Sequence, residues 1–270
     1  MQGAKRVITG VSSILKTKRV IKLHCLFLLG CLLFMFFQLH AQVLRVAIPD
    51  EDYPPYYYVL DNSLTGFSVE TLHDIASDLA IQLEFQRLPW SRVVNHVETG
   101  KADLIPVFYK TPLRMQQFEY SHESYLVDPI VLLCANPCPF KFDGTLASVG
   151  EEPVATVRQF SYGSLLDEME FARADLVESD NMLFKMLLAK RVKLIMASAN
   201  TIRHSALLQQ AGDKVVMLQP ALDSVEVFFA FGKEHGISAA QREQFNQALA
   251  KFKRGERYQQ LLKKYQLQPR

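Results

Sequence analysis

Two cysteines, Cys134 and Cys138 in the run C-A-N-P-C, are the residues whose type and spacing most directly indicate a chemical role. Two thiols at this spacing either close a disulfide or contribute two ligands to a metal ion. A structural metal site needs two further ligands at suitable spacing, and none lies nearby in the sequence. We therefore expect no metal site here, and we expect a short disulfide loop if the chain reaches an oxidising compartment.

Motifs of three large enzyme classes are absent from the sequence. It contains no Gly-rich phosphate-binding loop, no HExxH zinc motif and no GxSxG nucleophile elbow. Nucleotide hydrolysis, zinc proteolysis and α/β-hydrolase chemistry therefore have no support, and any ATP hydrolysis would belong to a partner. We expect a non-enzymatic protein without a cofactor.

The first 41 residues differ in composition from the rest. They contain six basic residues and no acidic one before an apolar run of 13 residues from Cys25 to Phe37. Because a membrane-spanning helix needs about 20 apolar residues, the pattern predicts a signal peptide, cleaved after Ala41, and a periplasmic location. Two alternatives stay open: the segment remains as an uncleaved anchor, or Leu28-Leu29-Gly30-Cys31 acts as a lipobox.

Charge and composition limit the partners of the mature chain. Removal of the leader takes 6 of the 30 basic residues and none of the 28 acidic ones, which leaves 24 minus 28, or −4. Apolar residues make up 49% of the sequence and charged residues 21%, which is typical of a folded globular protein. No basic stripe remains that would favour nucleic acid. We expect an exported monomer.

After the leader, short apolar runs alternate with helical patterns, which is typical of an α/β protein. Strands are expected at residues 44–48, 81–85, 103–107, 125–134, 154–157, 192–197 and 225–231. Helices are expected after Ser68 and Ser91 as N-caps, near 165–169 and 183–188, and from Asn200 as N-cap to Gly212.

The C-terminal region carries the clearest helical pattern. Ser238 and Gln241 form a capping box, and apolar residues follow at helical spacing from Phe245 to Phe252. Gly255 is expected to end this helix, and the same spacing repeats over 258–265. The pattern predicts two amphipathic helices that pack on the fold and keep their basic residues in water.

In their order and spacing, the motifs of residues 43–267 resemble the bacterial extracellular solute-binding proteins of the polar amino acid type, family 3. The motifs are L-R-V-A-I, Y-P-P-Y, T-G-F-S-V-E, P-W-S-R, G-K-A-D-L-I, T-P-L-R, F-E-Y-S and F-K-R-G-E-R-Y-Q-Q-L-L-K-K-Y. The resemblance implies the type II periplasmic binding protein fold, with two α/β lobes joined by two crossing strands. It implies a first lobe at 42–132 and 226–270 and a second at 133–225, with crossings near 129–135 and 225–231.

The resemblance also implies how a ligand's carboxylate is bound. Arg114, in T-P-L-R, matches the family arginine that grips an α-carboxylate, because a guanidinium can donate two parallel hydrogen bonds. Tyr109 and Thr111 match positions that line the site just before it. Ser161 matches a second-lobe hydroxyl at a helix N-terminus, where N–H groups favour an anion. A surface arginine and an ordinary N-cap are the structural alternatives for Arg114 and Ser161.

Three aromatic residues match the positions that sandwich the ligand's side chain in this family. These are Tyr53 and Tyr56 in D-Y-P-P-Y, and Trp90 in P-W-S-R. Aromatic rings offer a large contact area at a low cost in conformational entropy. The alternative is that the tyrosines pack on the sheet and that Trp90 belongs to the core.

The sequence departs from the family at two positions. Ser198 stands where amino acid binders place a carboxylate for the ligand's ammonium group, and Gln159 stands where a glycine is usual. An uncompensated ammonium in a closed cleft is costly. Either another acid substitutes, with Asp50, Glu70 and Glu226 as possibilities, or the ligand is not a standard α-amino acid.

Together these observations predict a periplasmic receptor for a small polar, carboxylate-bearing ligand, an amino acid or similar, which it presents to an ABC permease. One alternative is a stand-alone sensing or scavenging receptor with a non-amino-acid ligand. A second is a dehydratase-like enzyme on the same scaffold, for which Glu70 and His122 are the candidate acid and base.

Overall fold

The computed structural model describes residues 42–158 and 160–269. The signal peptide expected at 1–41 and the departure at Gln159 lie outside the described residues. Within the described part of the chain, no helix is long and apolar enough to cross a membrane. A compact unit of the fold begins at Val43.

One sheet runs through both lobes, in the strand order β4-β1-β5-β12-β7-β10-β8-β9. The first lobe contains β1 (Val43–Pro49), which lies parallel to both β4 (Gln82–Leu88) and β5 (Leu104–Tyr109). The second lobe contains the parallel strands β8 (Val154–Val157), β9 (Arg173–Val177) and β10 (Leu194–Ser198). The predicted α/β class is confirmed.

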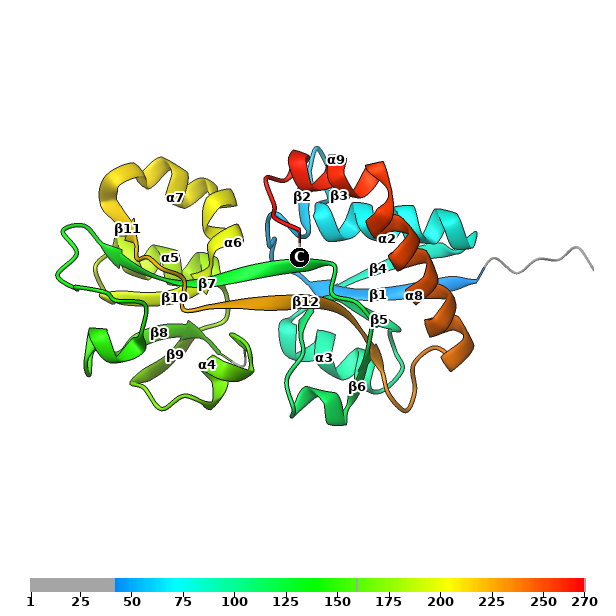
Figure 1. The fold of residues 1–270 in the computed structure, drawn as a ribbon, viewed down its shortest axis with the longest axis horizontal. Coiled ribbons are helices and arrows are strands. Elements are labelled where there is room, and N and C mark those ends of the chain that lie inside the picture. The colour runs from blue at the N-terminus through cyan, green and yellow to red at the C-terminus, as the bar shows by residue number, and fades with distance from the viewer. Residues whose placement is uncertain (1–41, 159, 270) are drawn as a thin grey trace, which may run out of the picture. The chain divides into compact units, whose positions relative to one another are not determined.

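Two long strands connect the lobes (Figure 1). They are β7 (Leu126–Ala135) and β12 (Asp223–Gly232), which pair antiparallel to each other over Leu126–Val227 to Ile130–Asp223. The far end of β7 pairs with β10, and the far end of β12 pairs with β5. Two crossing strands were predicted and are present, whereas the exact lobe boundaries stay a prediction.

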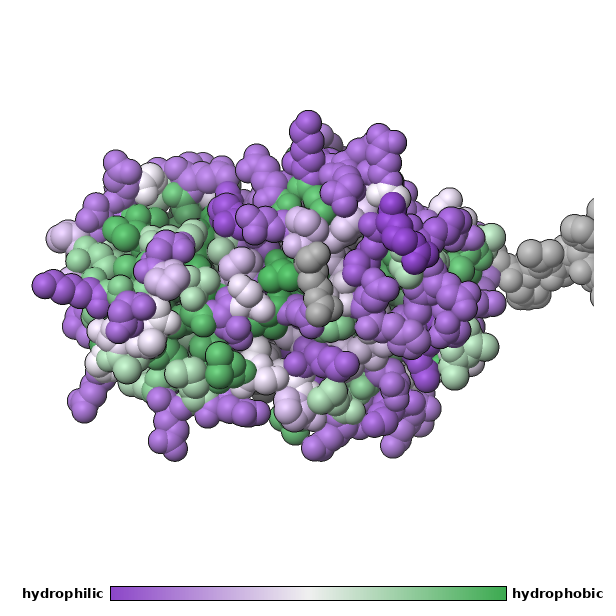
Figure 2. Space-filling view, viewed as in Figure 1, coloured by the Kyte–Doolittle hydropathy of each residue, from purple (hydrophilic) through white to green (hydrophobic). Residues whose placement is uncertain are grey.

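Helices cover both faces of each half of the sheet (Figure 1). In the first lobe these are α2 (Phe67–Leu79), α8 (Ala239–Arg254) and α9 (Glu256–Lys264) on one face and α3 (Trp90–Glu98) on the other. In the second lobe they are α5 (Asp180–Leu188), α6 (Ala199–His204) and α7 (Ala206–Ala211) on one face and α4 (Ser164–Glu168) on the other. Hydrophilic side chains cover most of the surface over α8 (Figure 2).

Short elements complete the described chain. Strands β2 (Tyr58–Leu60) and β3 (Ser63–Thr65) form a hairpin, β6 (Phe118–Tyr120) pairs with β12, and β11 (Val215–Met217) pairs with β7. The 3-10 helices are η1 (Arg114–Gln116), η2 (Leu146–Val149) and η3 (Gly212–Lys214).

One buried apolar cluster contains residues of both lobes, among them Leu44 of β1 and Leu194 of β10, and two smaller clusters each belong to one lobe. In the second lobe, Leu133 of β7 and Ile195 of β10 pack with Phe184 of α5. Under the first lobe, Val93 and Val97 of α3 pack against the sheet. Full burial of such side chains stabilises the fold by about 1.5–3 kcal/mol each. The loops between these clusters can therefore carry the polar groups of a site.

Three predicted helix caps are wrong, because tertiary contacts use the polar residue differently. Ser68 lies inside α2, which Gly66 caps, and its Oγ lies 2.8 Å from the buried hydroxyl of Tyr125. Ser91 lies inside α3, which begins after Pro89.

The third wrong cap is in the second lobe. Ser198, and not Asn200, caps α6 by accepting hydrogen bonds from the N–H groups of Asn200 and Thr201. The capping box of Ser238 and Gln241 is confirmed.

The predicted disulfide joins Cys134, at the end of β7, to Cys138, and their Cα atoms lie 5.7 Å apart. Cys134 is completely buried, because its strand lies inside the second-lobe part of the sheet. The bridge therefore closes a short loop at the end of a crossing strand.

Candidate functional site

A pocket of about 610 Å³ lies between the two lobes, and we call it the cleft pocket. Its first-lobe wall comes from the loops that follow β1 and β4, and its second-lobe wall comes from the segments that follow β8, β9 and β10. Parallel strands carry their loops at the same edge of a sheet, which is why residues far apart in the sequence meet here. The residues that line the cleft pocket include Glu51, Tyr53, Trp90, Phe160, Ser179, Asp180 and Thr201.

Acidic side chains dominate the charge of the cleft pocket. Its lining contains Asp50, Glu51, Asp52, Glu178 and Asp180 but a single basic residue, Arg87. Arg87 pairs with Asp52 at 2.9 Å, and Glu178 pairs with Arg158 at 2.7 Å.

The remaining three acids, Asp50, Glu51 and Asp180, have no cationic partner among the described residues. The wall formed by the described residues therefore carries uncompensated negative charge. Asp50 is also one of the acids that the sequence offered as a substitute for the missing carboxylate.

Four buried polar atoms of the lining have no hydrogen-bond partner among the described residues. They are the Tyr53 hydroxyl, Ser179 Oγ, Asp180 Oδ1 and Thr201 Oγ1. The Tyr53 and Thr201 hydroxyls lie close enough to interact with each other, although not in a well-formed hydrogen bond. Buried polar groups in folded proteins are almost always hydrogen-bonded, because an unmade bond costs about 1–3 kcal/mol. Ser179 Oγ and Asp180 Oδ1, beside this weakly paired couple on the same pocket, indicate that a bound molecule completes their hydrogen bonding.

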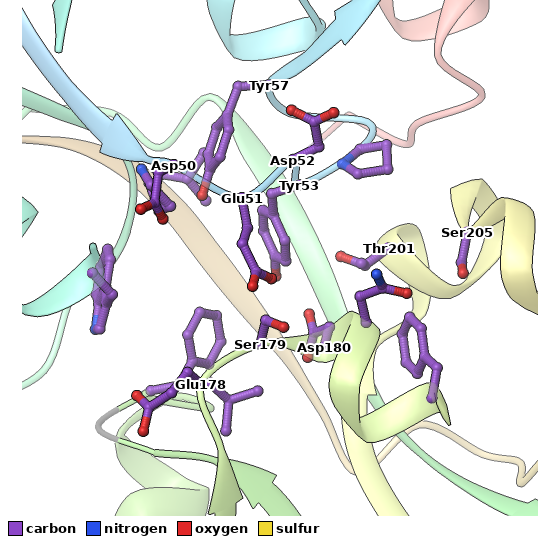
Figure 3. A pocket seen from close by; sticks show the side chains of 18 of the residues that line it. Asp50, Glu51, Asp52, Tyr53, Tyr57, Glu178, Ser179, Asp180, Thr201 and Ser205 are labelled. Carbon is purple, nitrogen blue, oxygen red and sulfur yellow. The ribbon is translucent and has the colours of Figure 1, made fainter. Parts of the chain in front are cut away.

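Asp180 and Glu51 approach the cleft pocket from opposite lobes. In Figure 3 the Glu51 carboxyl group extends from the first-lobe loop toward Ser179 and Asp180 at the start of α5. Burial raises the pKa of Asp180 to about 7, and the nearby carboxylates of Asp128 and Glu51 add to the shift. Asp180 thus titrates near neutral pH, and a cation placed beside it would favour its ionised form.

Phe160 of the second lobe lies against the aromatic residues of the first. Its ring centroid is 6.3 Å from that of Tyr53, 6.3 Å from that of Trp90 and 6.0 Å from that of Tyr109. Tyr53 and Trp90 line the cleft pocket, as the sandwich role would require. In this structure Phe160 contacts both rings, at the place where the family resemblance puts the ligand's side chain.

Arg114 does not line the cleft pocket. Its guanidinium carbon lies 4.0 Å from the ring centroid of Phe108, and Nη1 donates a hydrogen bond of 3.2 Å to the Tyr109 carbonyl. Thr111 accepts from the Arg114 N–H at 3.3 Å. Burial lowers the pKa of Arg114 from its usual value. Three of the predicted carboxylate-binding residues thus lie together, engaged with one another.

Ser161 is occupied within its own lobe. Its hydroxyl donates to a carboxylate oxygen of Asp167 in α4, and the Tyr162 N–H donates to the other oxygen at 3.0 Å. Asp167 therefore accepts the hydrogen bonds that the family resemblance assigns to a ligand's carboxylate.

Ser198 points away from the cleft pocket and into a buried network. Its hydroxyl donates to Asp128 of β7, which also accepts a hydrogen bond of 2.6 Å from the Tyr109 hydroxyl. Tyr56, fully buried, accepts from the Asn200 side-chain amide at 3.2 Å. Burial raises the pKa of Asp128 despite these hydrogen bonds. This network joins both lobes at the crossing strands.

The other candidate acids and bases lie outside the cleft pocket lining. Glu70 of α2 pairs with Arg257 at 2.9 Å and with Lys264 at 2.6 Å. Glu226 of β12 accepts from Ser124 at 3.2 Å. The His122 side chain is 67% exposed, and its Nδ1 lies 3.9 Å from Glu243.

Five residues that line the cleft pocket were not among the predicted site residues: Glu51, Phe160, Ser179, Asp180 and Thr201. For Ser179 and Asp180 a signal was available. They lie two and three residues after β9, and a polar residue beyond the carboxyl end of a parallel strand is positioned to face a cleft. Strand β9 itself was not predicted.

Comparison with known proteins gives a family and a fold. The model of the bacterial extracellular solute-binding proteins, family 3, matches residues 44–268. No curated protein sequence matches the chain.

Among solved structures, the chain is similar to an amino acid ABC transporter substrate-binding protein, AbpA of Streptococcus pneumoniae, bound to L-arginine. The identity is 18%, the match covers 83% of this chain and 94% of the other, and the TM-score is 0.68.

Two further solved structures have the same fold. A histidine kinase sensor domain with similarity to periplasmic binding proteins is 16% identical, with coverages of 83% and 95% and a TM-score of 0.69. An ancestral amino acid-binding protein, a precursor of cyclohexadienyl dehydratase, is 19% identical, with coverages of 83% and 95% and a TM-score of 0.66. At these identities the comparisons establish the type II periplasmic binding fold.

Proposed function

The chain belongs to the bacterial extracellular solute-binding proteins, family 3, and from this premise we propose that it is an exported receptor that binds a small polar molecule in the cleft pocket and presents it to an ABC-type permease. The observation that carries the proposal is the set of four unpartnered buried polar atoms on the cleft pocket. A pocket of about 610 Å³ is of the size that small ligands occupy. Its two walls belong to different lobes, so binding can be coupled to closure.

The periplasm is the proposed location. The leader pattern of residues 1–41 and the disulfide of Cys134 and Cys138 both support export to an oxidising compartment. The proposed first lobe, 42–132 and 226–270, and second lobe, 133–225, move relative to each other about β7 and β12.

For the ligand contacts, we propose Tyr53 and Trp90 as the aromatic part of the site, because both line the cleft pocket. A ligand's carbon skeleton would pack on their rings. AbpA is bound to L-arginine, and an amino acid or a similar molecule is the class that we propose for this receptor.

A thermal-shift screen tests the receptor function. Residues 42–270 are heated with amino acids, short peptides, organic acids and amines, because a ligand that binds only the folded state raises the melting temperature. We expect at least one compound to raise it. A chain that responds to no compound in the panel contradicts the proposal.

The same screen with Arg114→Lys tests the predicted role of Arg114. Lysine keeps the positive charge but loses the two parallel hydrogen bonds. A shift by an amino acid that disappears in this variant assigns the carboxylate to Arg114, whereas a shift that survives it assigns the ligand's contacts to the cleft pocket, which Arg114 does not line.

A stand-alone sensing or scavenging receptor is the second candidate function. The contact between Ser161 and Asp167 favours it, because the donors predicted to bind a ligand's carboxylate serve the chain itself. The sensor domain with the same fold supports this candidate. Co-purification of the mature chain with permease subunits would favour import over this alternative.

We propose that the protein binds its ligand without converting it. Glu70 is held by Arg257 and Lys264, and neither it nor His122 lines the cleft pocket. The ligand identified by the screen should therefore be recovered unchanged after prolonged incubation with the protein, as mass spectrometry would show.

A further inference from the structure

The cleft pocket carries more negative charge than its own residues neutralise, and we propose that its ligand is a small organic cation, an alkyl amine or guanidinium compound, held between Glu51 and Asp180 and bound without an α-carboxylate. This inference rests on the proposed receptor function and replaces the amino acid class named there with an organic cation that lacks an α-carboxylate. Glu51 comes from the first lobe and Asp180 from the second, so a cation between them would draw the lobes together.

Asp180 Oδ1 calls for a ligand that donates a hydrogen bond, because an ionised carboxylate only accepts, whereas the unpartnered hydroxyls on the cleft pocket can donate or accept. Asp180 is 8% exposed and Thr201 is 3% exposed, and each has a side-chain oxygen without a partner on the cleft pocket. The hydroxyls of Tyr53 and Ser179 complete the set. An ammonium group offers three donors and a guanidinium five, and neither has an acceptor. A carboxylate-bearing end would instead face Glu51 and Asp180 as a like charge.

Aromatic rings around the carboxylates suit the rest of such a ligand. The lining includes the rings of Tyr53, Tyr57, Trp90, Phe160 and Phe184. Ring faces attract cations and pack against methylene groups. The combination of acidic groups and rings fits an organic cation with a short carbon chain.

The groups that would bind an α-carboxylate are already engaged by the chain. Arg114 packs on Phe108 and donates to the Tyr109 carbonyl, outside the cleft pocket lining. Asp167 accepts the hydrogen bond of Ser161. Phe160 lies against both Tyr53 and Trp90. The cleft pocket itself is lined by acidic residues, among them Glu51 and Asp180.

Agmatine and L-arginine test this inference directly, because agmatine is arginine without its α-carboxylate. Binding of both, and of putrescine, to residues 42–270 is measured by titration calorimetry at pH 8. We expect agmatine or putrescine to bind at least as tightly as L-arginine. Glu51→Gln and Asp180→Asn should each weaken that binding at least about tenfold, the equivalent of 1.4 kcal/mol.

Glu168→Gln is the matched control, since Glu168 is an exposed second-lobe acid that does not line the cleft pocket. It should bind like the parent. L-Arginine binding at least about tenfold more tightly than both amines, or wild-type affinity in Glu51→Gln and Asp180→Asn, overturns the inference and leaves the receptor function standing. Binding of none of the amines, amino acids, peptides or organic acids contradicts both.

Discussion

The hydroxyl of Ser161 donates a hydrogen bond to the carboxylate of Asp167 within the second lobe. The same carboxylate accepts from the Tyr162 N–H at 3.0 Å and lies 3.7 Å from Arg173. The family resemblance assigns the Ser161 hydroxyl to a ligand's carboxylate, and in this structure its acceptor is Asp167. Asp167 thus takes the place that the family resemblance gives to a ligand's carboxylate. Its removal should change which ligands bind.

Asp167→Ala is expected to raise the affinity for L-arginine relative to agmatine. The substitution releases the Ser161 hydroxyl and the Tyr162 N–H from their acceptor, so an α-carboxylate gains partners that agmatine cannot use. Titration calorimetry of both compounds gives the affinity ratio. Glu168→Ala, one residue along and exposed, is the control. An unchanged ratio in Asp167→Ala would show that Asp167 does not decide between the two.

Asp180→Asn is expected to stabilise the ligand-free protein at alkaline pH. The pKa of Asp180 is raised from 3.8 to about 7 in the fold, so the folded state holds the proton more tightly than the unfolded chain does. Stability is therefore lost as pH rises from about 4 to about 7, and the full cost remains above that range. Besides Asp128 and Glu51, the hydroxyls of Tyr53 and Tyr57 lie near this carboxyl group.

Urea unfolding of Asp180→Asn and the parent at pH 5 and pH 8 measures this effect. The variant's advantage should grow by on the order of 2 kcal/mol between the two pH values. Glu168→Gln should show no such trend. An advantage that stays constant with pH would contradict the assignment of a raised pKa to Asp180.

Tyr109→Phe is expected to destabilise the fold by about 1–3 kcal/mol, because it leaves the buried carboxylate of Asp128 without its 2.6 Å hydrogen bond. Burial already raises the pKa of Asp128, and loss of a donor to the charged form should raise it further. The added cost should therefore be larger at pH 8 than at pH 5 in urea unfolding. Tyr58→Phe, which changes a tyrosine outside this network, should cost less and show no pH trend.

The fold was largely predictable because its strands are apolar and its caps are local. Residues 154–157 were expected as a strand and form β8, and Ser238 caps α8 within three residues of its partner Gln241. Strand β9, R-A-D-L-V, was missed because its apolar pattern is weak. It is held by pairing with β8, in which Arg173 lies opposite Val154, and this partner is distant in sequence.

The site was less predictable for a related reason. Tyr53 and Trp90 follow predicted strands within recognisable motifs, and both line the cleft pocket. Asp180 follows the missed strand, so nothing local marked it as part of a site. The motif around Arg114 suggested a role, but the direction of its side chain depends on the Phe108 ring and the Tyr109 carbonyl. The spacing of residues in the sequence does not predict contacts of this kind.

Reduction of the disulfide between Cys134 and Cys138 is expected to lower the free energy of unfolding by about 2 kcal/mol, the value that chain entropy gives for so short a loop. The loop lies outside the cleft pocket lining, so ligand affinity should not change. Urea unfolding with and without dithiothreitol measures the first quantity, and calorimetry measures the second. The free energy of unfolding of the double variant Cys134→Ala and Cys138→Ala should not change when dithiothreitol is added. A loss of ligand affinity on reduction would instead show that this loop is coupled to the cleft through β7, on which Cys134 and Asp128 both lie.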